Sequence, residues 1–353
     1  MLQPGECLPP GPPALVVALD LSVLTVMMGW TMKTPLRGRS GHPPERAWVP
    51  DHKRGRRHRI GASGVSVVIP CRSVSALAQG LLDTLRADPV CHEVIVVING
   101  SPRLSEDVLG PLVRVLWLAQ AGLSAAKNFG LNETHSEIVA FLDDDTVPDK
   151  AWCAELAAAF ARHPAATVIG GPIRLAPEIE ALGLGPEGRG YLAELDLGID
   201  EIRCQTFRYP YGGNSAVRGN AARAAGGFAE AFGYAGGRLL PNEEIDLFRR
   251  MEAAGGEVWY TPSAGVTHCV AVNRASLPCL LRRAFWQGIG DRRTARRHPD
   301  LALPRPWRSA LLAARWGAAA AFRSLVGQRS VASDHALRSV RALGSIVGTV
   351  WSE

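Results

Sequence analysis

The sequence predicts an α/β protein with a mostly parallel sheet that carries helices on both faces. From residue 64 onward, short β-branched runs alternate with segments of helical periodicity. The runs are continuously apolar, as expected for strands that are buried on both faces. Polar clusters follow two of them, at residues 99–101 and 143–145. The carboxyl ends of parallel strands form ligand-binding crevices, so these two clusters are expected to meet at one site.

Size and composition suit such a fold. Of the 353 residues, 47% are hydrophobic and 20% are charged, so the chain can bury one large core and is not a disordered protein. The net charge of +6 fits an anionic small molecule, a membrane surface or nucleic acid. Seven cysteines without paired spacing favour a reduced, cytosolic protein over a disulfide scaffold or a zinc site.

The first 63 residues are predicted to form an appendage. Residues 1–13 are rich in proline and glycine, residues 14–50 are expected to form a small β unit with a hairpin near Asp20, and a basic linker begins at residue 51. The apolar run 14–30 is interrupted by Asp20 and is shorter than the roughly 20 residues of a membrane span. A membrane-inserted helix is therefore the less favoured alternative.

Four strands are expected ahead of the three aspartates, at residues 65–69, 93–98, 113–118 and 138–142. The first strand is expected to stop at Pro70. A helix with four leucines on one face follows it, between residues 77 and 85. A second short helix, capped by Ser124, carries Lys127.

Beyond the aspartates, the expected elements are a helix over 148–160, strands at 168–173 and 211–217, a helix over 243–254, and strands at 258–260 and 265–269. Residues 211–217 have the pattern of a sheet edge, with close backbone approach at Gly212 and Gly213. From Ser276 the pattern is mainly helical. The expected domains are the appendage 1–63, an α/β domain 64–275 and a helical extension 276–353.

The three aspartates, Asp143, Asp144 and Asp145, directly follow a buried strand. Their mutual repulsion raises their pKa values unless a cation or hydrogen-bond donors compensate for it. A hard divalent cation with oxygen ligands supplies that compensation. A helix start would also favour acids, but three in succession after an apolar strand indicate a functional site.

A second acidic cluster, NEEIDL at residues 242–247, opens a predicted helix. General base catalysis needs a carboxylate whose pKa is moved toward neutrality, and neighbouring acids produce such a shift. The simpler interpretation is that the helix dipole favours acids in the first turn. His268 ends a predicted strand and is either an additional metal ligand or an ordinary strand-end histidine.

Taken in order, these segments resemble the family 2 glycosyltransferases, which have the GT-A fold. The resemblance covers roughly residues 64–290 and rests on VSVVIP (65–70), EVIVVINGS (93–101), GLSAAKNFG (122–130), EIVAFLDDDTVP (137–148), GGNSAVR (212–218), NEEIDL (242–247) and RAFWQG (283–288). It implies a Rossmann-like GT-A sheet and an inverting transfer of a sugar from a nucleotide-diphosphate-sugar to an acceptor hydroxyl.

The resemblance also implies roles for single residues. Asp143 and Asp145 match the DxD motif that holds Mn²⁺ or Mg²⁺ and the diphosphate, and His268 matches a position that sometimes ligates the metal. The candidates for the catalytic base are Glu244, by its position in the motif, and its neighbours Glu243 and Asp246. The remaining candidates are Pro70, Asn99, Lys127, Asp144, Arg283 and Trp286 on the nucleotide-sugar side, and Gly213 and Asn214 on the acceptor side.

Three positions depart from the family pattern. Ile98 stands where an aspartate usually contacts the nucleotide base, which weakens an assignment of uracil. Lys127 stands where arginine is more usual, so the charge is kept without the forked geometry. Cys71 and Arg72 replace the usual pair after Pro70. The class is unaffected, and the donor nucleotide stays open.

One alternative family has a signature motif that the same residues match. FLDDDTV at residues 141–147 satisfies the DxDxT/V signature of haloacid-dehalogenase-like phosphohydrolases, in which Asp143 would be a nucleophile and Asp145 an acid/base. That strand normally opens the domain, whereas three strand–helix units precede it here. The alternative also leaves the acids of residues 242–247 without a role.

The expected partners are a nucleotide-sugar donor and a sugar, lipid-linked or peptide acceptor, without nucleic acid. The expected location is the cytoplasm. Residues 308–322 combine arginines with leucine, tryptophan and phenylalanine, so peripheral contact of the C-terminal helices with the inner face of the membrane is considered beside ordinary packing on the catalytic domain.

Overall fold

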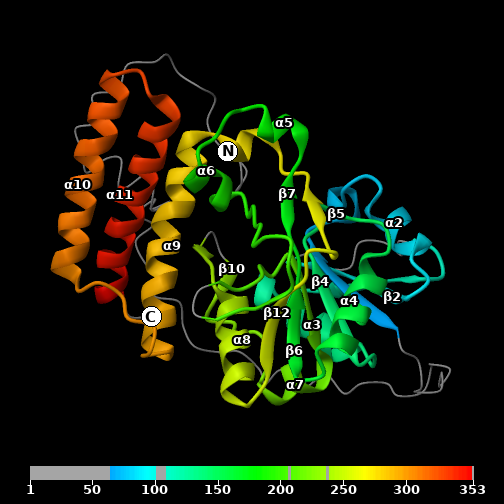
Figure 1. The fold of residues 1–353 in the computed structure, drawn as a ribbon. Helices are drawn as coiled ribbons and strands as arrows, with labels where there is room; N and C mark the ends of the chain where they lie inside the picture. The colour runs from blue at the N-terminus through cyan, green and yellow to red at the C-terminus, as the bar shows by residue number, and fades with distance from the viewer. Residues whose placement is uncertain (1–63, 101–108, 206–207, 236–237, 352–353) are drawn as a thin grey trace, which may run out of the picture. The chain divides into compact units, whose positions relative to one another are not determined.

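The computed structural model describes residues 64–100, 109–205, 208–235 and 238–351 (Figure 1). These residues belong to one compact unit. The predicted N-terminal β appendage, its hairpin and its basic linker lie outside the described residues.

The main sheet has the strand order β3-β2-β1-β4-β9-β6-β12-β8. Its strands are β1 Val65–Cys71, β2 Cys91–Asn99, β3 Val113–Leu118, β4 Ile138–Leu142, β6 Ala166–Gly170, β8 Ile202–Arg203, β9 Asn214–Arg218 and β12 Glu257–Tyr260. The pairs β1–β2, β1–β4, β2–β3 and β6–β12 are parallel, while β9 and β8 run antiparallel to their neighbours. The prediction of a mostly parallel sheet is confirmed.

Strand β1 continues beyond the expected stop at Pro70. Its pairing with β4 ends at Val68, which lies opposite Phe141. Proline has no backbone N–H to give to a neighbouring strand, and by residue 70 no β4 partner remains to receive one. The strand can therefore extend to Cys71 along β2, and it is buried throughout.

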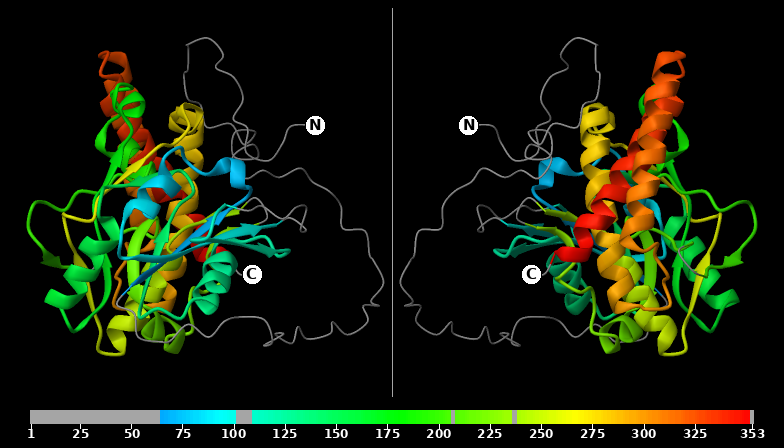
Figure 2. Two further views of the ribbon diagram at one scale, coloured as in Figure 1. Left: turned by 90° about the vertical axis from the view of Figure 1, so that its right-hand side faces the viewer. Right: turned by 90° about the vertical axis from the view of Figure 1, so that its left-hand side faces the viewer.

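Helices cover both faces of the sheet, as expected (Figures 1 and 2). One hydrophobic cluster joins Val67 and Ile69 to α2 (Leu81–Ala87) and α4 (Trp152–Arg162). The other joins Val68 and Phe141 to α3 (Leu123–Glu133), α7 (Gly219–Ala224) and α8 (Glu243–Ala253). Residues of β1 alternate between the two clusters, which is the period-2 alternation of side chains along a strand.

Several local predictions were wrong. The helix expected over residues 77–85 forms only from Leu81, as α2, after Gly80 in the left-handed conformation at φ 84°. A short 3-10 helix, η1 (Val74–Ala76), precedes the expected range. Ser124 does not cap α3. It lies inside the helix, and its hydroxyl donates a hydrogen bond to the carbonyl of Phe232 at 3.0 Å. Helix α4 begins at Trp152 rather than at residue 148.

Residues 211–217 do not form a sheet edge. Strand β9 lies between β4 and β6, paired with both. The predicted strand 168–173 divides into β6 and β7 (Ile173–Leu175). Strand β7 joins β13 (Val266–His268) and β5 (Thr146–Pro148) in a second sheet of order β5-β13-β7. This small sheet brings His268 beside the segment that follows the aspartates.

The remaining described elements are short, except for three C-terminal helices. They are α5 Pro177–Glu180, α6 Pro186–Tyr191, β10 Gly233–Ala235, β11 Arg238–Leu240, η2 Val272–Ala275, α9 Leu277–Arg297, α10 Pro306–Leu325 and α11 Arg329–Val350. Helices α9 and α11 approach closely at Gly344. A Cβ atom at this position would lie only 2.0 Å from the carbonyl oxygen of Phe285, so only glycine fits there. Helix α10 packs on α11 (Figure 2).

Among the described helices, none is both long and apolar enough to cross a membrane. The free thiols among the described residues are Cys71, Cys91, Cys153, Cys204 and Cys269. Cys279 is disulfide-bonded, which departs from the expectation of a reduced chain.

Candidate active site

The aspartate segment is a turn that links the main sheet to the small sheet. Strand β4 ends at Leu142 and β5 begins at Thr146. The carbonyl of Asp143 accepts hydrogen bonds from the backbone N–H and the hydroxyl of Thr146, at 3.2 and 2.7 Å. The carbonyls of Asp144 and Asp145 accept from the backbone N–H groups of residues 78 and 269, both at 2.7 Å. The turn is thus held from both sides, and it directs the three carboxylates to different neighbours.

The carboxylate of Asp145 lies between two basic groups. Its Oδ1 is 3.1 Å from Nε2 of His268, and its Oδ2 accepts a hydrogen bond from Nη1 of Arg274 at 2.6 Å. Burial raises the pKa of Asp145, but the contacts with His268 and Arg274 outweigh it and hold the pKa at about 2. Asp145 is therefore an anion at neutral pH.

His268 is oriented by the protein backbone. Its Nδ1 lies 2.7 Å from the carbonyl oxygen of Leu192, a contact in which Nδ1–H donates. The buried Nε2 has no hydrogen-bond partner among the described residues, although Oδ1 of Asp145 is close by. Metal-ligating histidines commonly donate their second ring N–H to a carbonyl in this way. The imidazole lone pair and the carboxylate oxygen together fit two ligand positions of a divalent cation.

The two groups do not form a complete metal site. No group of three or more His, Cys, Asp or Glu side chains suited to a metal lies within the described part of the chain. The remaining ligands would have to come from water or from the oxygens of a bound diphosphate, which Mg²⁺ commonly uses. Burial lowers the pKa of His268 and Asp145 raises it, with a net increase, so a proton and a cation compete for Nε2.

Arg283 and Trp286, which the resemblance places near the donor phosphates or the acceptor, contact protein groups in this structure. Nη1 of Arg283 donates to the carbonyl of Tyr191 at 2.7 Å, one residue before the carbonyl that orients His268. The ring of Trp286 is buried, with its centroid 5.3 Å from that of Trp351 near the end of α11. Arg283 thus braces the backbone behind the histidine, and Trp286 packs between helices instead of facing a phosphate.

A second group of side chains gathers over the backbone of Gly212 and Gly213. A Cβ at Gly213 would lie 2.5 Å from Oδ2 of Asp143, and a Cβ at Gly212 would lie 2.7 Å from Nζ of Lys127 and 3.3 Å from Cβ of Glu244. Three chain segments therefore meet where only glycine leaves room. This close approach is the physical reason for the pattern that resembled a sheet edge.

The replacement Gly213→Ala is expected to displace the Asp143 carboxylate. Because the new methyl group overlaps that carboxylate, donor turnover should fall by about 100-fold, the usual cost of a shift of roughly 1 Å at a reacting centre. Steady-state kinetics on the purified variant measures the loss. Gly190→Ala is the matched control, since a Cβ there meets nothing within 4 Å. Unchanged kinetics in Gly213→Ala would show that Asp143 has no part in catalysis.

Lys127 pairs with Glu243 in the interior. Nζ of Lys127 lies 3.0 Å from Oε1 of Glu243, and only 2% and 7% of the two side chains are exposed. Lys127 also lies over the ring of Phe228, with Nζ 5.2 Å from its centroid. Burial lowers the pKa of Lys127, but the nearby acids Glu243, Asp143 and Glu244 raise it by more than burial lowers it, so the pKa is above its usual value. Lys127 is therefore a fixed cation that neutralises Glu243.

Glu244 lies beside this pair without an ion pair of its own among the described residues. Burial, followed by the charge of Glu243, raises its pKa to about 8. Asp144 is similarly raised to about 7 by burial and by its two aspartate neighbours. Burial also raises the pKa of Asp143, against the opposing effect of Lys127. Glu244 is thus able to exchange a proton near neutral pH.

The start of α8 is fixed by Asn242, which adopts the left-handed conformation at φ 80°. Its Oδ1 accepts from Gln287 at 2.9 Å, and its Nδ2 donates to Asp291 and Thr294, both at 3.2 Å. Asp291 in turn accepts from Arg341 of α11 at 2.8 Å. Side chains of α9 and α11 therefore hold the turn that places Glu243 and Glu244.

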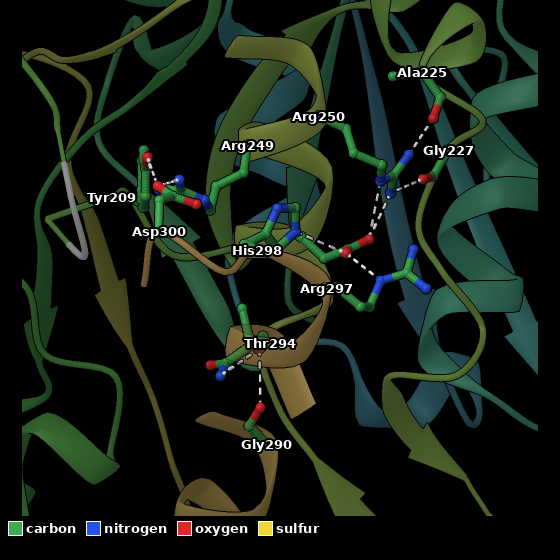
Figure 3. A network of polar contacts seen from close by, with 12 residues as sticks. Tyr209, Ala225, Gly227, Arg249, Arg250, Gly290, Thr294, Arg297, His298 and Asp300 are labelled. Carbon is green, nitrogen blue, oxygen red and sulfur yellow. Dashed lines mark hydrogen bonds and ion pairs between the residues drawn. The ribbon is translucent and has the colours of Figure 1, made fainter. Parts of the chain in front are cut away.

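Asp246 is not positioned as a base. Its side chain is fully buried, and Arg250, Arg297 and His298 converge on its carboxylate (Figure 3). The distances are 2.9 Å to Nη2 of Arg250, 2.7 Å to Nε of Arg297 and 3.0 Å to Nε2 of His298. Burial raises its pKa, but these partners lower it below the usual value. The carboxylate ties α8 to the end of α9 and has no free oxygen facing a substrate.

The surroundings of Asn214, Asn99 and Pro70 also consist of protein groups. The buried amide of Asn214 accepts from Trp152 and donates to the carbonyls of residues 172 and 264, all at 2.9 Å, so it cannot contact an acceptor. Asn99 donates to the carbonyl of Cys71 at 3.0 Å and accepts from Gly122 N–H at 3.3 Å. It ties the ends of β1 and β2 to the start of α3. Pro70 is buried inside β1.

Sequence reasoning missed Arg274 and Leu192. Arg274 lies in η2 and pairs with Asp145, while Leu192 contributes only a carbonyl oxygen to His268. A basic residue six positions after a candidate ligand is a weak signal. A backbone carbonyl leaves no signal in the sequence.

Comparisons with known proteins concern the family and the fold of the chain. Residues 66–195 match the sequence profile described as Glycosyl transferase family 2. The chain is similar to the pre-mycofactocin glycosyltransferase of Mycobacterium tuberculosis, with 32% identity over 252 residues, covering 68% of this chain and 49% of the relative. It is also similar to the succinoglycan biosynthesis protein ExoM of Rhizobium meliloti, with 29% identity, covering 65% of this chain and 71% of the relative.

Among solved structures, the chain is similar to a mannosyltransferase from Pyrobaculum calidifontis in complex with GDP-mannose and Mn²⁺. The TM-score is 0.54 at 16% identity, and the match covers 81% of this chain and 87% of that chain. This likeness concerns the fold. The chain spans about half the length of the mycobacterial relative. The profile match includes the three aspartates but ends before Glu243, Glu244 and His268.

Proposed function

Since the chain belongs to the family 2 glycosyltransferases and has the GT-A fold, we propose that it transfers a sugar from a nucleotide-diphosphate-sugar to an acceptor hydroxyl with inversion. One observation carries the proposal. The aspartate turn, the buried Lys127–Glu243 pair and Glu244 meet over Gly212 and Gly213, so a carboxylate of raised pKa lies beside the acids that would hold a metal.

On the donor side, Asp145 and His268 would hold Mn²⁺ or Mg²⁺. When bound, the cation supplies positive charge that stabilises the leaving diphosphate. Arg274 adds a second fixed cation next to Asp145, and the carbonyl of Leu192 keeps the imidazole oriented. Asp143, packed on Gly213, would contact the sugar or ribose hydroxyl groups of the donor.

On the acceptor side, Glu244 is the proposed base. It would take the proton of the acceptor hydroxyl as that oxygen attacks the anomeric carbon, and its pKa of about 8 is suited to this transfer near neutral pH. Glu243 is held by Lys127 and positions the start of the helix. No covalent intermediate on the protein is required.

The geometry argues against the phosphohydrolase alternative. In that mechanism Asp145 would have to be protonated so that it could donate a proton to the leaving group. Its contacts with His268 and Arg274 instead hold its pKa at about 2. A carboxylate held ionised by two basic neighbours is poorly suited to the general-acid step.

The proposed base predicts the pH dependence of turnover. Only the deprotonated form of Glu244 can accept a proton, so the rate should rise as the pH increases through about 8 and be lost below it. Initial rates at saturating donor and metal measure this profile. A rate that does not change from acidic to alkaline pH would mean that another group is the base.

The class of reaction can be tested with a panel of nucleotide diphosphates, by measuring the melting temperature with and without Mn²⁺. A ligand that binds the folded state raises the melting temperature by mass action. A metal-dependent increase for one nucleotide therefore supports the proposal and identifies the nucleobase of the donor. Mg²⁺-dependent phosphate release from a phosphate ester, without consumption of any nucleotide-sugar, would overturn it.

For location and partners, we propose the cytoplasm and a nucleotide-sugar donor. The free thiols among the described cysteines support a reducing compartment, with Cys279 as the exception. The acceptor is a sugar, a lipid-linked group or a peptide.

A further inference from the structure

Helix α10 has two unlike faces. Ser309 and Ala313 are buried against α11, and the hydroxyl of Ser339 in α11 donates to the Ala313 carbonyl at 2.8 Å. Trp316 lies on the same side, with its ring centroid 5.0 Å from that of His335. This side of the helix packs on the rest of the protein, and the opposite side faces outward.

The outward face carries a stripe of large apolar side chains. Trp307, Leu311, Phe322 and Leu325 have exposed fractions of 55%, 63%, 59% and 86%. At 100° per residue these positions fall within about 60° of one another around the helix axis, with alanines between them, and the stripe is about 27 Å long. Soluble surfaces rarely keep so many large apolar groups aligned without a partner.

The charges around this stripe have one sign. Arg308, Arg315 and Arg323 are the charged residues of α10, which has no acid. Residues 305–351 hold seven arginines and one acid, Asp334, which is buried beside α6, so their net charge is 7 − 1 = +6. Arg308 lies over the ring of Trp307, 5.1 Å from its centroid, so cation and aromatic ring form one surface at the start of the stripe.

We propose that the outward face of α10 docks on the surface of an anionic lipid bilayer. A helix that lies in the interface buries tryptophan, phenylalanine and leucine among the acyl chains, while arginines along its flank bind lipid phosphates. A second copy of the chain docked through its own α10 would bring Arg308, Arg315 and Arg323 of that copy against the same face, and this like charge opposes self-association. The inference does not depend on the proposed reaction.

The test is flotation of the full chain with two kinds of vesicle, phosphatidylcholine alone and phosphatidylcholine mixed with phosphatidylglycerol. The wild-type protein is expected to float with the anionic vesicles at low salt. The variant Trp307→Ser, Leu311→Ser, Phe322→Ser should bind them at least about tenfold more weakly, because three exposed apolar groups are lost. Replacing Arg308 and Arg315 by glutamine should weaken binding by about fivefold per arginine.

Ile199→Ser is the matched control, because Ile199 is 90% exposed on a different part of the surface and should bind as wild type. All altered residues are exposed, so the melting temperature should not change. The proposal is overturned if wild-type protein stays unbound at low salt, or if the triple serine variant floats as well as wild type. A wild-type dimer that the serine variant converts to monomer, without flotation, would identify a second copy as the occupant.

Discussion

Replacing Glu244 by glutamine is expected to lower kcat by about 1,000-fold while leaving donor binding intact. Glutamine keeps the size of the side chain but cannot accept a proton, and general base catalysis contributes roughly 10²–10⁴ to a rate. The two nearby acids are already engaged, Glu243 with Lys127 and Asp246 with Arg250, Arg297 and His298. Steady-state kinetics with saturating donor and metal measures the effect.

Asp246→Asn is the control for this experiment. It removes a buried carboxylate that three basic groups share, so it should lower the stability by about 3 kcal/mol and retain most of the turnover. If Glu244→Gln keeps its rate and Glu243→Gln loses it, the catalytic base is Glu243. The assignment of Glu244, made because Glu243 is paired with Lys127, would then be wrong.

The same Glu244→Gln protein should be more stable than wild type at alkaline pH. The pKa of Glu244 rises from 4.5 to about 8 on folding, so the folded state holds a proton that the unfolded state has released between these values. Wild-type stability therefore decreases as the pH rises through this window and is constant above it. Glutamine removes that loss of stability. The free energy of unfolding of the variant should therefore exceed that of wild type by on the order of 2 kcal/mol near pH 8, and it should not differ below the pKa of the unfolded state.

The second large effect is expected for Asp145→Ala, which should abolish the Mn²⁺-dependent increase in melting temperature caused by a nucleotide diphosphate. Asp145 offers the anionic ligand beside Nε2 of His268, and alanine leaves only the imidazole. The apparent affinity for the cation should fall by at least about 100-fold. Titration of Mn²⁺ at fixed nucleotide concentration measures the change.

Asp149→Ala provides the comparison, since Asp149 pairs with Arg174 on the surface after β5 and should retain the full metal-dependent increase. Glu244→Gln should retain it as well, because that residue acts on the acceptor. If Asp145→Ala still shows the increase, the cation is held elsewhere, and the role assigned to the aspartate turn fails.

The strands of the main sheet could be predicted because each is rich in β-branched and other apolar residues. Residues 93–98, 113–118 and 138–142 all lie in strands of the structure. The position of β9 could not be read, because Gly212 and Gly213 give the same pattern at an edge and under a packed carboxylate. The strand expected at residues 265–269 is β13. The small sheet as a whole escaped prediction because its other strands, β5 and β7, are three residues long, too short to show a period.

The site could be predicted only as far as motif residues are chemically distinctive. The aspartates, His268 and the two glutamates come together as expected. Sequence shows which residues are polar and not which partners already satisfy them, as the contacts of Asp246 and Asn214 illustrate. Arg250 lies four residues after Asp246 in the same helix, a spacing typical of an ion pair, whereas Arg297 comes from α9 and leaves no pattern near Asp246.

The contacts of Asn242 limit how this protein can be divided or recombined. Gln287, Asp291 and Thr294 of α9 fix the residue that precedes the two glutamates, and Arg341 of α11 fixes Asp291. A fragment that ends at residue 275 would keep every acid of the site and lose the groups that aim two of them. Chimaeras between relatives should therefore exchange residues 242–351 as one block, so that the turn and its supporting helices are inherited together.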